Sequence, residues 1–183
     1  MSYSQADKLQ LLMMCDIYRA LGIENSFNPD VIEEAINTNN YWAISWGNEA
    51  LNDGTELPDQ VKFVVDTIEM YSLLDYTYSN MSDGDRQLVS NEVPRFSQAH
   101  STTFPGFDGN NEYEYIQIAR LLRMLGGFEG SDITKNSHHP SIDTYRRMLE
   151  VFLPIRDSFV HEVGISTQDF IRVYLARTHP SNR

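Results

Sequence analysis

Apolar residues recur every three or four positions along most of the chain, which is the spacing of one face of an α-helix. The longest row predicts a helix from Pro58 to about Asn80, with one apolar face that persists for about five turns. That face is formed by Val61, Val64, Val65, Ile68, Tyr71, Leu74 and Tyr78. A helix of this length is typical of the central element of a helical bundle.

The first helix is expected from about Gln5 to Leu21. Ser4 followed by Asp7 forms a weak capping box, and Gly22 suits the position just after a helix end. Helical spacing along this segment predicts a buried apolar stripe. Its members are Leu9, Leu12, Met13, Ile17 and Leu21.

Other helices begin at recognisable signals. Asn28 is a good N-cap for a helix that opens with Pro29. Further helices are predicted over about 111–125 and from about 141 to 152 or beyond. A last helix follows Ser166, which forms a capping box with Asp169. Ile165 and Phe170 can form the hydrophobic staple at this helix start. The inward residues expected for the helix that starts near 141 are Tyr145, Met148, Leu149 and Phe152.

The remaining stretches are less regular. The aromatic run at 41–46 favours a short extended piece, followed by one helical turn at 48–52. Residues 94–111 are predicted to form a long loop, because prolines and glycines interrupt them. The pattern predicts an all-α fold, a single multi-helix bundle of about six or seven helices with at most one short strand pair. We expect one domain over 1–183, in which residues 1–56 are a more peripheral N-terminal portion.

The formal net charge of −12 at pH 7 is unevenly distributed. Residues 1–144 carry 8 basic and 22 acidic side chains, whereas residues 145–183 carry 6 arginines and 4 acidic side chains. This balance disfavours general binding to the phosphate backbone of nucleic acids. The arginine-bearing end is expected to dock on the protein's own acidic surface, the alternative being an anion or an acidic partner.

The sequence also carries information about cellular location and redox environment. No apolar run reaches the length of a membrane helix, and the polar start MSYSQADKLQ does not resemble a secretory signal. The single cysteine, Cys15, excludes an internal disulfide and lies in the apolar run LLMMCDIY, which is typical of a packed thiol. We therefore expect a cytoplasmic protein that does not associate with a membrane.

The segment around Asp108 matches part of the pattern of a calcium-binding loop. Asp108, Asn110 and Glu112 occupy the first, third and fifth positions of an EF-hand pattern, but Tyr113 and Ala119 stand where glycine and a bidentate glutamate are needed. The better interpretation is a helix start, in which these polar groups accept backbone N–H groups. The adjacent His138 and His139 have no cysteine partner, so we predict no metal and no cofactor.

Three ordered motifs, VVDTIEMYSLL, PGFDGNNEYEYIQIARLL and YRRMLEVF, resemble the YfbU family of bacterial proteins. The resemblance covers nearly the whole chain. It implies a cytoplasmic helical domain of undefined activity and supplies no catalytic residues to carry over. The relatives have a shorter segment before GFD, so residues 94–103 are expected to be an insertion.

Polar and aromatic residues within these motifs are candidates for binding or for ion pairs. They are Glu69, Tyr71, Asp108, Glu112, Arg120, Tyr145 and Arg147. Glu112 and Arg120 share a helix face, and an arginine beside a core needs a carboxylate. We therefore expect Glu69 or Glu112 to pair with Arg120 or Arg147 between helices, with a ligand-binding pocket as the alternative.

The run IRDSFVHE is similar to the R-polar-x₃-H motif of the HEPN ribonucleases, with Arg156, Asp157 and His161 in its positions. The resemblance implies metal-independent RNA cleavage at a composite dimer site. In that chemistry the arginine stabilises phosphate charge and the histidine moves a proton. The alternative is that Arg156 only closes a helix, where a cation complements the dipole.

No complete catalytic set emerges, and nucleophile elbows and phosphate loops are absent from the sequence. The sequence favours a non-enzymatic helical binding or regulatory module that acts as a homodimer, with a protein as a further partner. The alternative function is an RNase-like toxin that uses Arg156 and His161.

Overall fold

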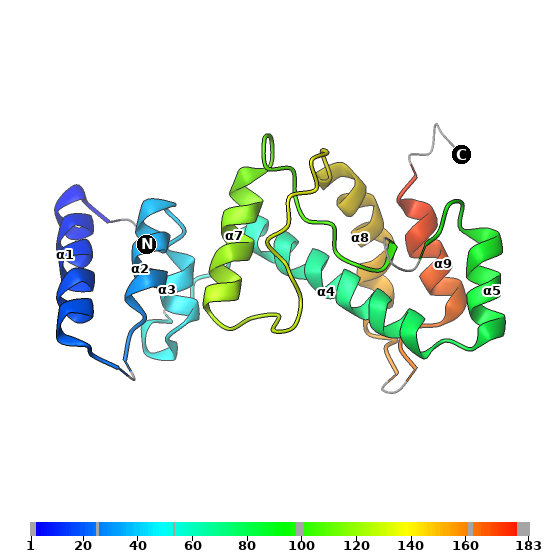
Figure 1. Cartoon of the computed structure of the whole chain (residues 1–183), viewed down its shortest axis with the longest axis horizontal. Coiled ribbons are helices and arrows are strands. Elements are labelled where there is room, and N and C mark those ends of the chain that lie inside the picture. The colour runs from blue at the N-terminus through cyan, green and yellow to red at the C-terminus, as the bar shows by residue number, and fades with distance from the viewer. Residues whose placement is uncertain (1–2, 25, 53, 98–100, 161–162, 179–183) are drawn as a thin grey trace. The chain divides into compact units, whose positions relative to one another are not determined.

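The computed structural model describes residues 3–24, 26–52, 54–97, 101–160 and 163–178 (Figure 1). Within these ranges the chain is all-α, as predicted, and the only β-type pairings are two isolated bridges, Phe107 with Asn136 and Val160 with Gly164. Eight α-helices are defined in the described ranges, close to the six or seven expected. Their bounds are Gln5–Leu21 (α1), Pro29–Asn37 (α2), Trp42–Trp46 (α3), Asp59–Asn80 (α4), Asp83–Glu92 (α5), Tyr113–Met124 (α7), Ile142–Arg156 (α8) and Thr167–Ala176 (α9), with a 3₁₀ turn at Glu49–Leu51 (η1).

The chain divides into two compact units. Unit 1 contains residues 1–61 and 117–131, and unit 2 contains residues 62–116 and 132–183. The boundaries fall inside α4 and inside α7, so each of these helices contributes to both units. A single domain over residues 1–183 stays a prediction.

The helix starts of unit 1 follow the predicted capping chemistry. The Ser4 hydroxyl accepts from the Asp7 N–H, and the Asp7 carboxylate accepts from the Ser4 N–H at 2.9 Å, which completes the capping box of α1. Gly22 ends α1 with φ of +60°. The Asn28 side chain caps α2 through the Asp30 N–H at 3.0 Å.

The prediction of an extended piece at 41–46 is wrong, because residues 42–46 form helix α3. Trp42 and Trp46 lie one turn apart and pack edge to face with ring centroids at 5.8 Å, a contact that helical spacing creates. The small residue Ala43 faces the core of unit 1, where it packs with Val31, Ala35 and Leu121. This short helix is additional to those that the sequence predicted. The turn expected at 48–52 is confirmed as η1.

The predicted burial of the α1 stripe is also wrong. Leu9, Met13, Ile17 and Leu21 are 53–69% exposed and Leu12 is half-buried, whereas Cys15, on the opposite side of the helix, is 4% exposed. The side that α1 turns toward α2 is therefore the one that carries Cys15. The apolar periodicity was recognised correctly, but the part of the chain that the structure describes does not cover it.

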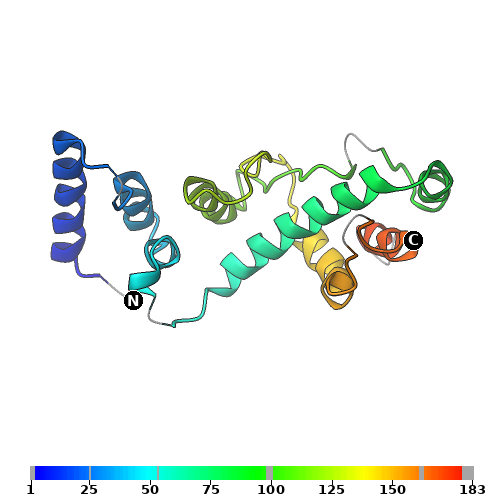
Figure 2. The ribbon, with the colours of Figure 1, turned by 90° about the horizontal axis from the view of Figure 1, so that it is seen from below.

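Unit 2 is built along α4, with α8 and α9 packed side by side and α5 against α9 (Figure 2). The predicted row on α4 is confirmed, since all its members are buried except half-buried Val65. The inward residues predicted for α8 are buried as well. Ser166 caps α9 through the Asp169 N–H at 3.1 Å, which confirms the last predicted helix start.

The segment predicted as a loop at 94–111 packs closely in its described part. Phe104 and Phe107 are buried and pack against each other with ring centroids at 5.5 Å. Gly106, with φ of +92°, lets the chain turn between them, and the backbone then pairs with residues 135–137. The segment places Asp108 and Glu112 at the start of α7.

Candidate functional site

Glu112 lies at the centre of the best-defined polar cluster of unit 2. Its carboxylate, 4% exposed, accepts the Ser141 N–H at 2.6 Å, the Ser141 hydroxyl at 2.5 Å and the Ile142 N–H at 3.0 Å. A fourth bond comes from the Asp108 N–H at 2.9 Å. Burial by itself would raise the Glu112 pKa, but these hydrogen bonds outweigh it and hold the pKa below the ordinary value.

The bonds from Ser141 and Ile142 give Glu112 a structural task. Ser141 is the N-cap residue of α8, yet its own side chain makes no capping bond to that helix. Glu112 instead accepts the exposed N–H groups at this end and places negative charge at the positive end of the helix dipole. The carboxylate thus caps α8 from a distant part of the chain, which sequence analysis did not foresee.

Asp108 does what the helix-start interpretation predicts. It accepts the Asn111 side-chain amide at 2.5 Å and the Asn110 N–H at 3.1 Å, and these bonds lower the Asp108 pKa. Its oxygens are therefore engaged in the turn before α7. Within the described residues no three His, Cys, Asp or Glu side chains converge on a common point.

Tyr71 and Tyr145 join the same region as core residues. Their rings pack edge to face at 5.7 Å, and the Tyr145 hydroxyl donates to the Gly106 carbonyl at 2.6 Å. Burial raises the pKa of Tyr71 to about 12 and raises that of Tyr145 further. Both side chains belong to the buried aromatic core of unit 2.

The partners of Arg147 differ from those expected. Arg147 donates to the Ala176 carbonyl at 3.3 Å and the Arg177 carbonyl at 3.0 Å, so it binds the carboxyl end of α9 instead of Glu69 or Glu112. Arg120 lies exposed on α7 within unit 1. Glu112 and Arg147 were expected to form glutamate–arginine pairs. Both bond to backbone groups instead.

Glu69 lies next to an arginine other than the two expected. Arg156, at the end of α8, lies 3.6 Å from the Glu69 carboxylate and 2.9 Å from the Asp66 carboxylate. Desolvation raises the Glu69 pKa, although the Arg156 charge acts in the opposite direction. Asp157 is the C-cap residue of α8, and His161 lies outside the described residues. Arg156 therefore closes the helix and binds two carboxylates.

These partners bear on the ribonuclease alternative. With two carboxylates beside it, the Arg156 charge is largely neutralised, which disfavours binding of an RNA phosphate. We expect that expressing wild type, Arg156→Ala or His161→Ala in bacteria leaves the total RNA profile the same as an empty vector does. Electrophoresis of RNA after induction is the measurement. Fragmentation by wild type that both substitutions abolish would contradict this expectation.

Polar groups in the described interior are all satisfied, since every buried side-chain nitrogen or oxygen there has a hydrogen-bond partner. The cluster around Glu112 therefore supports the fold rather than presenting an open reactive group. In the described ranges, none of the helices combines the length and the apolar character needed to cross a membrane.

The YfbU domain matches residues 1–170 of the chain. The UPF0304 protein MJECS11 of Methanocaldococcus jannaschii is 25% identical over 154 residues, which covers 79% of this chain and 86% of that protein. The family match includes Asp108, Glu112 and Ser141 of the polar cluster described above. The chain thus belongs to the YfbU family.

Proposed function

We propose that this protein is a non-enzymatic helical binding module of the cytoplasm that acts as a homodimer through one face of α1. The observation that carries the proposal is the outward stripe, defined as Leu9, Met13, Ile17 and Leu21. Its four members are 61, 57, 53 and 69% exposed, respectively. Large apolar side chains in a continuous row on one helix mark an interaction surface rather than ordinary solvent exposure.

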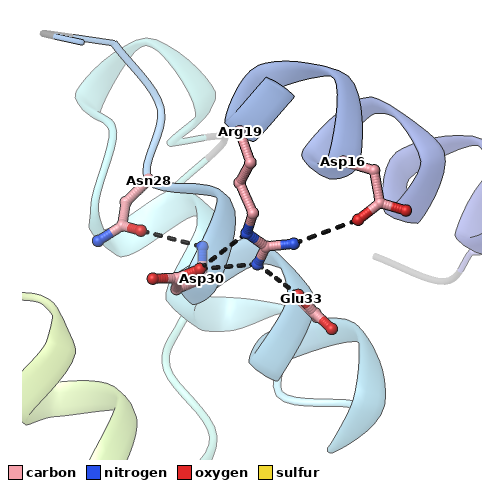
Figure 3. Close-up of polar contacts among 5 residues, drawn as sticks. All are labelled: Asp16, Arg19, Asn28, Asp30 and Glu33. Carbon is pink, nitrogen blue, oxygen red and sulfur yellow. Dashed lines mark hydrogen bonds and ion pairs between the residues drawn. The ribbon is translucent and has the colours of Figure 1, made fainter. Parts of the chain in front are cut away.

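The orientation of α1 on α2 supports this assignment. Figure 3 shows Arg19 of α1 reaching toward Asp30 and Glu33 of α2, with Asp16 on its other side. The Arg19 guanidinium is 2.7 Å from Asp30, also bonds to Glu33, and is 3.4 Å from Asp16. Together with the burial of Cys15, these contacts hold the opposite side of α1 outward.

The helix also has little core of its own. Cys15 is the one residue of α1 with a buried side chain, although the helix has 17 residues. Helices in water owe most of their stability to an apolar face packed against something else. A partner that covers the outward stripe would supply this missing packing.

A second copy of α1 fits the stripe. In an antiparallel pair centred on Met13, Leu9 of one copy lies level with Ile17 of the other, because each is four residues from the centre. Ala6 and Ala20, each seven residues from Met13, fall on the same face and let the two backbones approach at both ends. The row carries no charge, which matters when each copy has a net charge of −12.

The size of the patch sets the expected strength. Two copies of the stripe would bury on the order of 1,000 Å² in total, which lies at the lower end for a specific interface. We therefore infer a dimer that forms in the micromolar range and dissociates on dilution. Such a reversible dimer suits a regulatory module whose binding face is exposed when the copies separate.

The test is Met13→Glu in the full-length chain. Glutamate is a good helix former, so α1 should remain helical, but a charge at the centre of the interface should abolish dimerisation. Light scattering coupled to size exclusion at tens of micromolar should give a dimer mass for wild type and a monomer mass for the variant. Circular dichroism checks that the helix content is unchanged.

Met124→Glu is the matched control, since Met124 lies on α7 and is 37% exposed. It should leave the dimer intact. A monomeric wild type would overturn the homodimer, and a dimer that survives Met13→Glu would place the interface on another surface.

A further inference from the structure

Unit 1 contains an apolar cavity that the outward stripe does not use. It has a volume of about 270 Å³ and is lined by residues of α1 and α2, together with Ile44 of α3 and Leu51 of η1. Its walls include Leu11, Met14, Cys15, Tyr18, Phe27 and Ile32. All of its lining residues belong to unit 1, and none belongs to the stripe.

The chemistry of the walls selects the kind of molecule that fits. Met14 and Cys15 bring two sulfur atoms, and Tyr18 and Phe27 bring two aromatic rings. Sulfur atoms make favourable contacts with aromatic rings, and aromatic pairs gain from edge and offset packing. Loss of hydration among these walls would cost a charged group far more free energy than an uncharged ring.

The lining residue Tyr18 carries a hydrogen-bonding group. The Tyr18 hydroxyl lies 3.3 Å from the Ser26 hydroxyl, in a partly exposed position. Burial raises the pKa of the Cys15 thiol, so that side chain stays protonated and acts as an apolar wall. One hydrogen-bonding group at the edge of a ring would therefore find a partner near Tyr18.

The volume sets the size of the ligand. An apolar cavity of about 150 Å³ accepts one benzene ring. A cavity of about 270 Å³ accepts a flat bicyclic molecule with about ten non-hydrogen atoms. We propose that the α1–α2 cavity binds an uncharged bicyclic aromatic molecule of the size of indole, a binding activity separate from dimerisation.

The single cysteine offers a direct test, because Cys15 is the one thiol in the chain and lines the cavity. Reaction of Cys15 with a thiol reagent is followed in the full-length protein while indole is titrated. Indole at ten times its dissociation constant should slow the reaction about tenfold, since a bound ring would cover the Cys15 side chain that lines the cavity. Indole-3-acetate, which has the same ring and a negative charge, should slow it far less.

Two isoleucine variants locate the site. Ile32→Phe fills the cavity from α2 and should abolish protection by indole, whereas Ile23→Phe, at a 43% exposed position outside the cavity, should preserve it. The proposal is overturned if millimolar indole leaves the wild-type rate unchanged. Equal protection by the two probes, or protection that persists in Ile32→Phe, also overturns it. The wild-type titration does not depend on whether either variant folds.

Discussion

Glu112→Ala is expected to lower the free energy of unfolding by about 3–4 kcal/mol. The change removes the acceptor for the Ser141 N–H, the Ser141 hydroxyl, the Ile142 N–H and the Asp108 N–H. Buried donors without partners keep their full desolvation cost, and the start of α8 also loses a negative charge. Urea unfolding followed by circular dichroism measures the loss.

Glu112→Gln separates hydrogen bonding from space filling. Glutamine has almost the same shape, but its NH₂ group would meet donors where the carboxylate accepts. We expect it to recover little of the stability that Glu112→Ala loses. Glu150→Gln, at an exposed position on α8, is the control and should stay within about 0.5 kcal/mol of wild type. A glutamine variant as stable as wild type would mean that the charge and its four bonds do not hold α8.

The lowered Glu112 pKa also predicts how the difference in unfolding free energy between wild type and Glu112→Gln depends on pH. An unfolded glutamate has a pKa of about 4.3, so the carboxylate contributes its full stability above that value. As the pH falls through the lower folded pKa, the folded protein must also take up the proton, and the contribution disappears. Wild type and Glu112→Gln should therefore differ most near pH 7 and converge in acid.

Local rules predicted the helix starts well. Ser4, Asn28 and Ser166 each bond a backbone group two or three residues away, so the whole interaction is contained in a short stretch of sequence. The buried rows of α4 and α8 were predictable for a similar reason, since periodicity alone identifies the apolar side of a long helix.

Long-range partners were not predictable in the same way. Glu112 meets Ser141 across 29 residues, and Arg156 meets Asp66 across 90. Spacing along a helix shows which charges share a face but not which backbone group or carboxylate the fold brings near. An arginine can also satisfy its charge with carbonyls at a helix end, as Arg147 does, which a search for acidic partners overlooks.

The α1 stripe shows a further limit of periodicity. An apolar row predicts that a helix face packs against other apolar residues. It does not show whether those residues belong to the same chain or to a partner. Met13 is 57% exposed in spite of its place in a regular row. The exposure of the stripe contradicts the predicted burial, and for this reason it supports a partner that covers α1.

Gly106→Ala is expected to cost about 4 kcal/mol, combining backbone strain with a collision. Gly106 has φ of +92°, where an L-amino acid is strained. A Cβ there would lie 2.5 Å from the Lys135 carbonyl carbon and 2.8 Å from the Lys135 Cβ, and it would overlap the carbonyl oxygen. That oxygen accepts the Phe107 N–H at 3.3 Å, so the collision would push apart a pairing that the backbone makes.

Gly130→Ala isolates the strain from the collision. Gly130 has φ of +87°, but nothing lies within 4 Å of an added Cβ, so we expect a loss of only about 1–2 kcal/mol. Unfolding midpoints of the two variants give the difference. Relief of the collision requires residues 106 and 107 to shift, yet the Gly106 carbonyl also accepts the buried Tyr145 hydroxyl. Any shift therefore breaks a bond in the core, and equal losses in the two variants would show that residues 106 and 135 do not approach so closely.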